Sequence, residues 1–253
     1  MLQAIRSRPT PWFVLAAFVS LVGCGADKPR GERNLQYKIQ HSESPDTRAS
    51  DLNGRLADDE IRRVMDEQQA AFNHCFRSAP DAFISGHVEL TFVVTGAGRV
   101  DDVFVSKSNL GALKAEDCLV QTARYLEFPP PSGGKARFAF PFEWNEAGRR
   151  LSQPVEVAWG YSVLASHREL YERCRTKYKY DGPFNLTIYV GRLGAVLSSG
   201  YDSGTGPGVD FPSCVVDVTN GLRFSNPGNR IVKYKSLVEH LPDELSPMNK
   251  DVE

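Results

Sequence analysis

Four of the five cysteines in this 253-residue chain form two similarly spaced pairs. Cys75 and Cys118 lie 43 residues apart, and Cys174 and Cys214 lie 40 residues apart. In both pairs a phenylalanine follows the second cysteine ten residues later. This spacing indicates one small disulfide-bearing unit that occurs twice, and it favours the pairings Cys75–Cys118 and Cys174–Cys214 over the other connectivities that four cysteines allow.

A shift of 96 residues superposes the second half of the chain on the first. Leu90-Thr91-Phe92 then falls on Leu186-Thr187-Ile188. The other matched pairs are Gly98 with Gly194, Val100 with Val196, Cys118 with Cys214, Phe128 with Phe224, and Pro131 with Pro227. An internal repeat of this kind reduces the fold problem to one small unit.

The pattern of apolar residues predicts helices and strands in the same order in both units. Recurrence at three- and four-residue spacing predicts helices, and alternation predicts strands around a glycine-containing turn. In the first unit we expect a helix over 61–76, strands over 88–94 and 99–106, a helix over 114–125 and a strand over 138–142. In the second unit we expect a helix over 163–178, strands over 184–190 and 195–201, a helix over 214–222 and a strand over 231–235. Helices packed on one face of a small sheet make each unit an α+β sandwich of two layers.

The amino terminus carries the features of an export signal. Arg6 and Arg8 precede an apolar run that ends in Leu21-Val22-Gly23-Cys24. Basic residues, an apolar stretch and small residues in this order are typical of a secretory signal, and the run is too short to span a hydrocarbon core of ~30 Å comfortably. The last four residues resemble the bacterial lipobox, so we expect residues 1–23 to be a signal peptide and Cys24 to be acylated. The alternative is an ordinary cleaved signal next to a chance cysteine.

Residues 24–55 are rich in Arg, Asp, Ser, Gly and Asn and poor in apolar residues. This composition predicts a flexible tether that links a lipidated Cys24 to the folded body. The protein would then lie in the cell envelope, attached to a membrane through Cys24 and facing the periplasm. Gly25 stands where an aspartate often retains lipoproteins at the inner membrane, which favours the outer membrane.

Four cysteines in an oxidising compartment indicate two disulfides. Zinc is the rival explanation, but it would require cysteines at two- to four-residue spacing or clustered histidines, and the five histidines are scattered. The chain also has a formal net charge of −1, which gives no indication of nucleic-acid binding. We therefore expect no metal, no cofactor and no nucleic-acid partner.

A series of short motifs occurs in order within the first unit, and it resembles a known family. The motifs are Asp59-Glu60-Ile61-Arg62-Arg63-Val64, His74-Cys75-Phe76, Gly86-His87-Val88, Gly98-Arg99-Val100, Ser108-Asn109-Leu110-Gly111, Phe128-Pro129-Pro130-Pro131-Ser132-Gly133-Gly134 and Phe140-Pro141-Phe142. Over residues 56–144 the series is similar to the carboxy-terminal domain of AgmX/PglI-type proteins associated with gliding motility, a branch of the TonB carboxy-terminal superfamily. The second unit keeps both cysteines and the hairpin glycine, but it has Ser225-Asn226-Pro227-Gly228 in place of the proline-rich segment.

The resemblance implies tandem TonB-like interaction domains and not an enzyme. We expect domains at 56–146 and 155–241, each a three-stranded sheet packed by two disulfide-linked helices, and a polar tail at 242–253. Domains of this kind bind partners partly by adding a strand to a sheet edge. The implied function is that of a protein-binding or scaffolding adaptor with an envelope protein as its partner, in a gliding-motility or envelope transport assembly.

Strand addition needs a sheet edge with free backbone groups. If the third strand of each unit is an edge, Pro141 removes a backbone donor from the first unit. The third strand of the second unit has no proline, which makes it the candidate partner-binding edge. Its residues are Ile231, Val232, Lys233, Tyr234 and Lys235.

Three other interpretations stay open. A redox-active thiol–disulfide protein of the envelope is the main alternative, although such proteins usually have a reactive Cys-x-x-Cys and these pairs are remote in sequence. A duplicated domain could also serve only to brace an envelope complex. Finally, a run of basic and aromatic residues is either a cationic helix end or a site for an anionic envelope polymer; it comprises Arg173, Arg175, Lys177, Tyr178, Lys179 and Tyr180.

Overall fold

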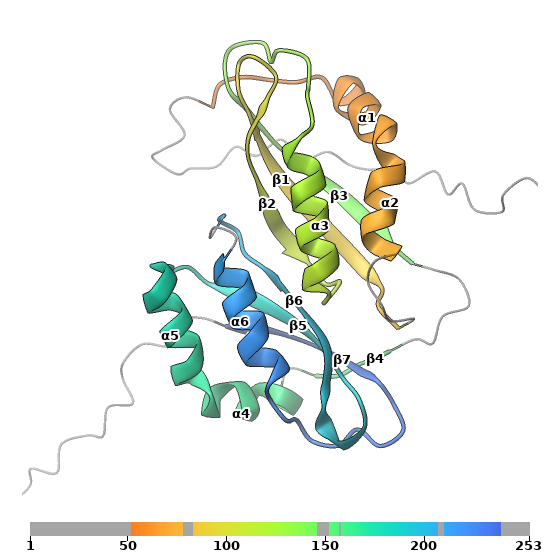
Figure 1. Ribbon diagram of the computed structural model, residues 1–253, viewed down its shortest axis with the longest axis vertical. Helices are drawn as coiled ribbons and strands as arrows, with labels where there is room; N and C mark the ends of the chain where they lie inside the picture. The colour runs from red at the N-terminus through yellow and green to blue at the C-terminus, as the bar shows by residue number, and fades with distance from the viewer. Residues whose placement is uncertain (1–51, 78–82, 146–151, 157, 207–209, 239–253) are drawn as a thin grey trace, which may run out of the picture. The chain divides into compact units, whose positions relative to one another are not determined.

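A computed structural model describes residues 52–77, 83–145, 152–156, 158–206 and 210–238 (Figure 1). The expected signal peptide, Cys24, most of the tether and the polar tail at 242–253 lie outside these residues. The described residues form a mixed α+β fold with two mainly antiparallel sheets, one in each half of the chain. Each half contains one of the two expected disulfides.

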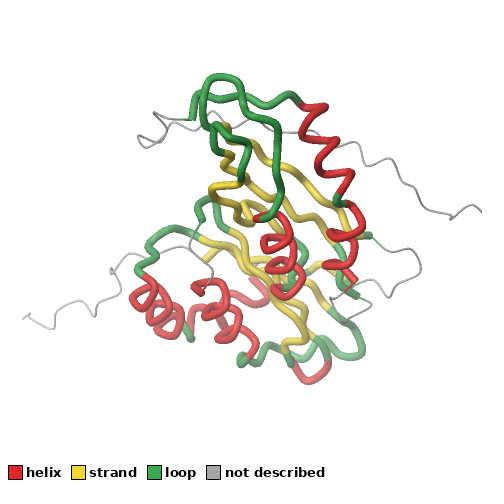
Figure 2. Tube along the Cα trace, turned by 45° about the horizontal axis from the view of Figure 1, so that its top comes forward, coloured by secondary structure: helices red, strands yellow, loops and turns green. Residues whose placement is uncertain are grey.

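The first half builds a three-stranded sheet in the order β2-β1-β3. Its elements are α1 (Asp58–Glu67), α2 (Gln69–Arg77), β1 (Gly86–Val94), β2 (Val100–Ser108), α3 (Leu113–Arg124) and β3 (Ala136–Trp144). Both strand pairs are antiparallel. The three helices lie on one side of the sheet (Figures 1 and 2).

The second half builds a four-stranded sheet in the order β4-β7-β5-β6. Its elements are β4 (Gln153–Pro154), α4 (Ala158–Ser166), α5 (Arg168–Tyr178), β5 (Phe184–Val190), the short 3₁₀ helix η2 (Arg192–Gly194), β6 (Val196–Asp202), α6 (Asp210–Asn220) and β7 (Val232–Val238). The sequence predicted three strands here, and β4 is the additional one. It is only two residues long and pairs in parallel with the start of β7.

When residue numbers are shifted by 96, the strand registers of the two sheets coincide except at Glu89, where the first sheet has an additional register shift. Leu90 pairs with Val105 in the first sheet, and Leu186 pairs with Tyr201 in the second. The match includes the β-bulge that precedes Val94 in one sheet and Val190 in the other. The pairs of the third strands, such as Phe92 with Phe138 and Ile188 with Tyr234, follow the same shift.

The edge of each third strand is covered at its start by the segment that precedes the first helix. Gly54 forms a parallel bridge with Ala136 in the first half, and Gln153 pairs in parallel with Val232 in the second. The amide of Gly54 donates to Lys135 O, and that of Gln153 donates to Ile231 O. Gly54 was expected within the flexible tether and Gln153 between the domains, but both have strand partners.

The first helix of each unit was predicted as one continuous element, and it is divided in both halves. The break falls seven residues before the first cysteine, at Gln68 and at His167. There the backbone N–H groups of Gln68 and His167 donate three residues back, to Met65 O and Leu164 O. Three-residue bonds tighten and end an α-helix. At the second break the His167 Nδ1 and Ser166 Oγ both contact the Val163 carbonyl oxygen, which further competes with the helical bonds.

The disulfides and the hairpin turns hold the helices on their sheets. Each bond joins the helix before the hairpin to the helix after it, with Cα–Cα distances of 5.4 Å for Cys75–Cys118 and 5.9 Å for Cys174–Cys214. Beyond the second helix, the backbone returns to the turn of the hairpin. The Phe128 N–H donates to Gly98 O at 2.8 Å, and the Phe224 N–H donates to Gly194 O at 2.9 Å. The repeated glycines and phenylalanines therefore make the same contact in both halves.

We predict that Gly98→Ala and Gly194→Ala each destabilise the fold strongly. Both glycines have positive φ, and a Cβ would lie 1.9 Å from Phe128 O or 1.7 Å from Phe224 O. The left-handed conformation alone costs about 1–2 kcal/mol for a residue with a Cβ, and relief of the clash adds to this. Urea unfolding should show the loss. Gly204→Ala is the control because nothing lies within 4 Å of its added Cβ, and an equal loss there would contradict the explanation.

Candidate functional site

The four paired cysteines lie at the interface between helices, with one sulfur of each pair deeply buried. Cys75 and Cys174 are each 1% exposed, while Cys118 and Cys214 are partly exposed. The two disulfides expected from the repeat, Cys75–Cys118 and Cys174–Cys214, are present, one in each half. Cys24, the expected lipidation site, lies outside the described residues.

The predicted partner-binding edge is open only in part. Ile231 and Lys233 accept backbone hydrogen bonds from Gln153 and Val155, so the short strand β4 covers the start of β7. Val232 and Tyr234 point into the core and are buried. Beyond Lys233, no described strand pairs with the outer side of β7.

The two lysines of this edge bind the first half of the chain. Lys233 Nζ donates to Ser85 O at 2.6 Å and lies 5.4 Å from the Tyr189 ring. Lys235 Nζ donates to Ser108 O at 2.7 Å and pairs with Asp202 at 2.9 Å. Burial, together with repulsion from Lys235, lowers the pKa of Lys233 to about 8. Lys233 and Lys235 were expected only as part of a partner-binding edge, and their side chains bind the first half of the chain instead.

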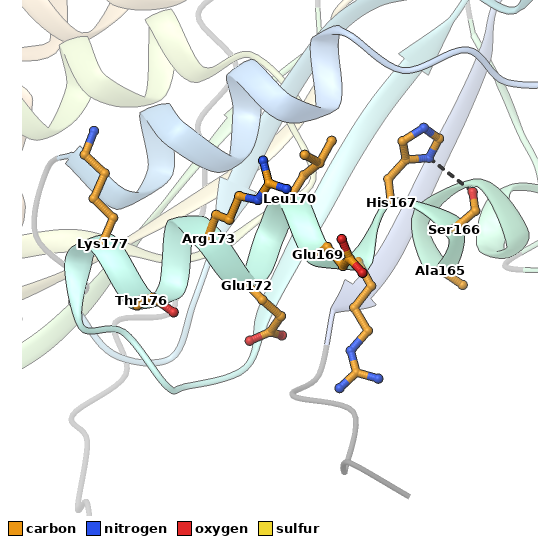
Figure 3. Close-up of a pocket in the computed structure, with 10 residues that line it drawn as sticks. Ala165, Ser166, His167, Glu169, Leu170, Glu172, Arg173, Thr176 and Lys177 are labelled. Atoms are coloured by element: carbon orange, nitrogen blue, oxygen red, sulfur yellow. Dashed lines mark hydrogen bonds between the residues drawn. The ribbon is translucent and has the colours of Figure 1, made fainter. Parts of the chain in front are cut away.

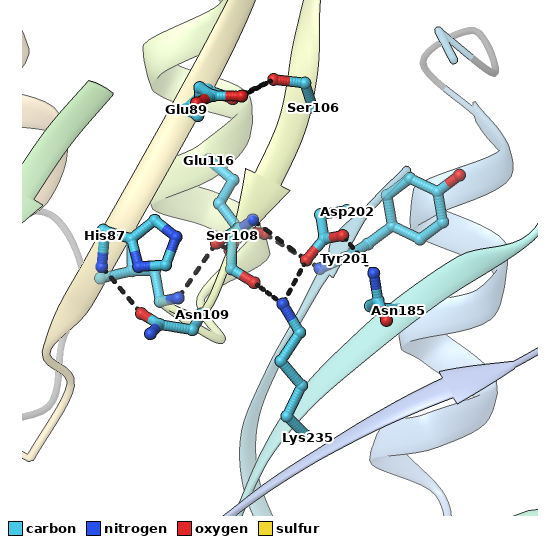
Figure 4. A network of polar contacts seen from close by, with 11 residues as sticks. His87, Glu89, Ser106, Ser108, Asn109, Glu116, Asn185, Tyr201, Asp202 and Lys235 are labelled. Atoms are coloured by element: carbon cyan, nitrogen blue, oxygen red, sulfur yellow. Dashed lines mark hydrogen bonds and ion pairs between the residues drawn. The ribbon is translucent and has the colours of Figure 1, made fainter. Parts of the chain in front are cut away.

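A buried carboxylate, Glu116, stands at the centre of the contacts between the halves (Figure 4). It projects from α3, is 1% exposed and accepts hydrogen bonds from Ser108 Oγ at 2.7 Å and from the Tyr201 N–H at 3.1 Å. The facing backbone at Gly200 approaches so closely that a Cβ there would lie 2.5 Å from a Glu116 oxygen. Desolvation by burial raises the pKa of Glu116 to about 7, against the lowering effect of its two hydrogen bonds.

Asp202 extends this network into the second half. Its carboxylate accepts from the Ser108 N–H at 3.0 Å, from Lys235 Nζ at 2.9 Å and from Asn185 Nδ2 at 2.6 Å (Figure 4). We call Ser108, Glu116, Asp202 and Lys235 the joining cluster. A buried polar group is retained at low cost only when hydrogen bonds satisfy it. The joining cluster therefore specifies how β2 and α3 meet β6 and β7.

The joining cluster was not predicted from sequence, and Lys235 was expected only as part of the partner-binding edge. Glu116 lies between Ala115 and Leu119 on the buried side of α3, so a carboxylate on an otherwise apolar helix face was the available signal. Ser108 entered only as part of a family motif. Asp202 carried no local signal, because its partners come from other strands.

A small cavity of about 80 Å³ lies beside Glu116, between α3 and β2. Its lining comprises Asp102, Val103, Phe104, Val105, Leu113, Glu116, Asp117, Val120, Arg124, Tyr201, Gly206 and Pro212. A water molecule occupies about 30 Å³ in the liquid, and metabolite sites usually measure about 300–1,000 Å³. The cavity therefore suits a few waters and is too small for a metabolite.

A larger hollow of about 1300 Å³ lies along α5 (Figure 3). Every lining residue belongs to the single stretch Ala165–Lys177, so the hollow has one described wall. It carries charges of both signs, including Glu169, Glu172 and Arg173. One wall of mixed charge does not define a ligand class.

The basic and aromatic run at the end of α5 is partly internal. Arg175 is 4% exposed, donates to Gly182 O and Val238 O, and stacks over the Phe184 ring at 4.9 Å. Tyr180 is also buried and donates to Pro183 O. Only part of the run faces solvent, which favours a helix end with a structural arginine over a polymer-binding patch.

We predict that both disulfides resist mild reductant in the native protein. Attack requires access to a sulfur by an incoming thiolate, and burial of Cys75 and Cys174 leaves only the partly exposed Cys118 and Cys214 as points of attack. Alkylation after treatment with dithiothreitol, followed by mass spectrometry, should find the four cysteines unlabelled until urea is added. Rapid labelling of one pair under native conditions would instead support the redox alternative.

We also predict that Glu116 makes the protein less stable as pH rises. The pKa of Glu116 is raised from 4.5 to about 7 in the fold, so the folded protein keeps a proton that the unfolded chain releases between these values. Stability therefore falls as pH rises through this window, by up to about 3 kcal/mol. Urea unfolding at about pH 5 and about pH 8 should show a smaller fall for Glu116→Gln than for the parent.

The exposed Glu127→Gln is the matched control for that measurement. Burial also raises the pKa of Asp117 to about 6, which adds a fall of the same sign, whereas the lowered pKa values of His87 and Lys233 make stability rise with pH. The difference between the parent and Glu116→Gln is therefore the quantity to compare. If Glu116→Gln had the same pH dependence of stability as the parent, the Glu116 carboxyl would not be the cause of the fall in stability with rising pH.

Within the described ranges, no group of three or more His, Cys, Asp or Glu side chains is arranged to hold a metal ion. Among the same residues, no helix has the length and apolar character needed to cross a membrane.

Comparisons with family models, with curated proteins and with solved structures found no match for this chain.

Proposed function

We propose that the protein is a non-enzymatic adaptor of the bacterial cell envelope, anchored through a lipidated Cys24 and binding another envelope protein. Two disulfides in a domain of this size suit an oxidising compartment. The export signal and lipobox-like segment in the sequence support the same location. A motility or envelope transport assembly is the setting that the family resemblance suggests.

We further propose that the two halves are tandem domains of the TonB carboxy-terminal type. The coincidence of strand registers at a shift of 96 residues supports a duplication. The matched contacts of Gly98 with Phe128 and of Gly194 with Phe224 support it as well. Since the hydrogen bonds of the joining cluster connect the two halves, the halves would bind a partner as one rigid unit.

The observation that carries the proposal is the outer edge of β7. The carbonyls of Ile231 and Lys233 bind β4, so the peptide groups of these residues point away from β5. Orientation alternates along a strand, and Lys235 and Leu237 therefore direct their N–H and C=O groups to the same outer side. No described strand covers this part of β7. Such unpaired groups are a template for strand addition.

The first half has a proline at the matched position of its own edge. A shift of 96 residues places Leu237 on Pro141, and the strand registers agree, since Glu89 pairs with Pro141 and Asn185 with Leu237. A proline at this position lacks the outward N–H but breaks no bond to the neighbouring strand. The second half therefore keeps a donor that the first half lacks.

We predict that Leu237→Pro weakens partner binding by roughly fivefold, the effect of one lost hydrogen bond worth about 1 kcal/mol. The first half accommodates proline at the matched position, so the variant should fold. Its matched control is Leu237→Thr, which changes the half-exposed side chain but keeps the N–H. The measurement is in-cell cross-linking of the tagged full chain, with mass-spectrometric identification of the captured protein.

Capture of one dominant envelope protein by the parent and by Leu237→Thr, with reduced capture by Leu237→Pro, is the expected result. Equal capture by a folded Leu237→Pro variant would exclude strand addition at this edge. Capture of abundant bystander lipoproteins alone would count against the adaptor function itself.

A further inference from the structure

The hairpin turns of the two halves occupy matched places in the fold, but they differ in surface chemistry and in the conformation of one residue, since Leu193 has positive φ and the matched Ala97 does not. Gly98 and Gly194 both have positive φ, and each lies against the backbone of the matched phenylalanine. The turns are also bridged to the segment after the second helix, by Arg99 with Glu127 and by Ala195 with Arg223. The two turns are therefore held in the same place on their sheets, and their exposed side chains can be compared position by position.

The first turn carries small residues and balanced charges. Gly96 and Ala97 form its tip, and the nearby charged residues are Arg99, Asp101, Glu127 and Lys135. Asp101 pairs with Lys135 at 2.9 Å. These four charged residues sum to zero, and the turn itself carries no large apolar side chain, although the exposed Tyr125 lies two residues before Glu127.

The second turn carries leucines and arginines at the matched positions. Arg192 replaces Gly96, Leu193 replaces Ala97, Leu197 replaces Asp101, and Arg223 replaces Glu127. Leu193 is 78% exposed and Leu197 is 42% exposed. Arg192 and Arg223 are exposed, as is Arg230 nearby. We call Arg192, Leu193, Leu197, Arg223 and Arg230 the second-turn patch.

The backbone holds Leu193 outward in an unusual conformation. Leu193 has a φ of 60°, which is uncommon for a residue with a large side chain. Its N–H donates to Asn226 Oδ1 at 3.2 Å, and the same oxygen accepts from the Gly228 N–H at 2.9 Å. Conformations of this kind persist only where surrounding bonds maintain them, and they are common at functional sites.

The charge of the second-turn patch has one sign. The segments that form it, residues 190–201 and 218–232, contain no aspartate or glutamate. Arg230 is fixed by Pro227 O and Gln153 Oε1, which keeps a third cation beside the turn. The β5–β6 turn and the segment after α6 run together at the lower end of the second half in Figure 1.

We propose that the second-turn patch binds the surface of an anionic lipid bilayer. Exposed leucines at the tip of a turn enter the boundary between headgroups and acyl chains, and arginines around them bind lipid phosphates. A turn that projects from the fold suits a deformable lipid surface. The matched turn of the first half has neither the exposed leucines nor the excess of arginines. The proposal concerns the second half alone and does not depend on the adaptor function or on lipidation of Cys24.

Hydrogen–deuterium exchange of the full chain carrying Cys24→Ser tests the proposal. The probes are vesicles of phosphatidylcholine alone and of phosphatidylcholine mixed with phosphatidylglycerol. The readout is local, so membrane contact elsewhere in the chain does not affect it. Peptides that cover residues 191–197 and 221–228 should gain protection with the anionic vesicles. The matched turn at residues 95–101 is the internal control and should not change.

The decisive variant replaces second-turn residues by those of the first turn, as Leu193→Ala with Arg223→Glu. Protection at residues 191–197 should fall at least fivefold in this variant, and it should also fall at high salt because the attraction is electrostatic. Equal protection at both turns, or equal protection by neutral vesicles, would overturn the proposal. Absence of protection at residues 191–197 with anionic vesicles would overturn it as well and would leave the patch for a protein partner.

Discussion

In each half, the chain must return from the end of a helix to the turn of a hairpin, and only a glycine permits that approach. At Gly98 and Gly194 the carbonyl of a phenylalanine occupies the space that a side chain would need. This contact fixes one end of the helix, and the disulfide fixes its middle against the preceding helix. With the helices held on one face, the sheet edges and the hairpin turns are the surfaces left for other functions.

The two halves meet through polar groups and not through a shared apolar core alone. Tyr189 packs with the first half and bonds Ser85 through its hydroxyl, while the joining cluster satisfies one buried carboxylate from each side. Hydrogen bonds of this kind require one relative arrangement, whereas apolar contacts tolerate several. Lys233 and Lys235 of β7 bind the first half and also flank the open edge of the sheet. The contact between the halves and the open edge therefore belong to the same strand.

Elements and pairings that repeat were predictable from sequence, because each match in one half supported its counterpart. The cysteine spacing predicted both disulfides, and the matched glycines predicted both turns. The breaks at Gln68 and His167 were missed because apolar periodicity continues across them. The short strand at Gln153 was missed because two residues carry no periodicity. The roles of Glu116 and Asp202 depend on contacts between distant segments, which a local pattern cannot express.

The parallel pairing of Gln153 with Val232 sets an order of assembly. A chain is synthesised from its amino terminus, and the first half has all its strands once Trp144 has emerged. The second half begins with β4. Among the described residues, β4 pairs only with β7, which is the last strand of the second half. Until β6 has formed, the Gly200 and Tyr201 backbone does not cover Glu116. Its ionised carboxylate is then solvated by water. The side chain that joins the halves therefore changes from a hydrated group to a buried one as β6 packs against it.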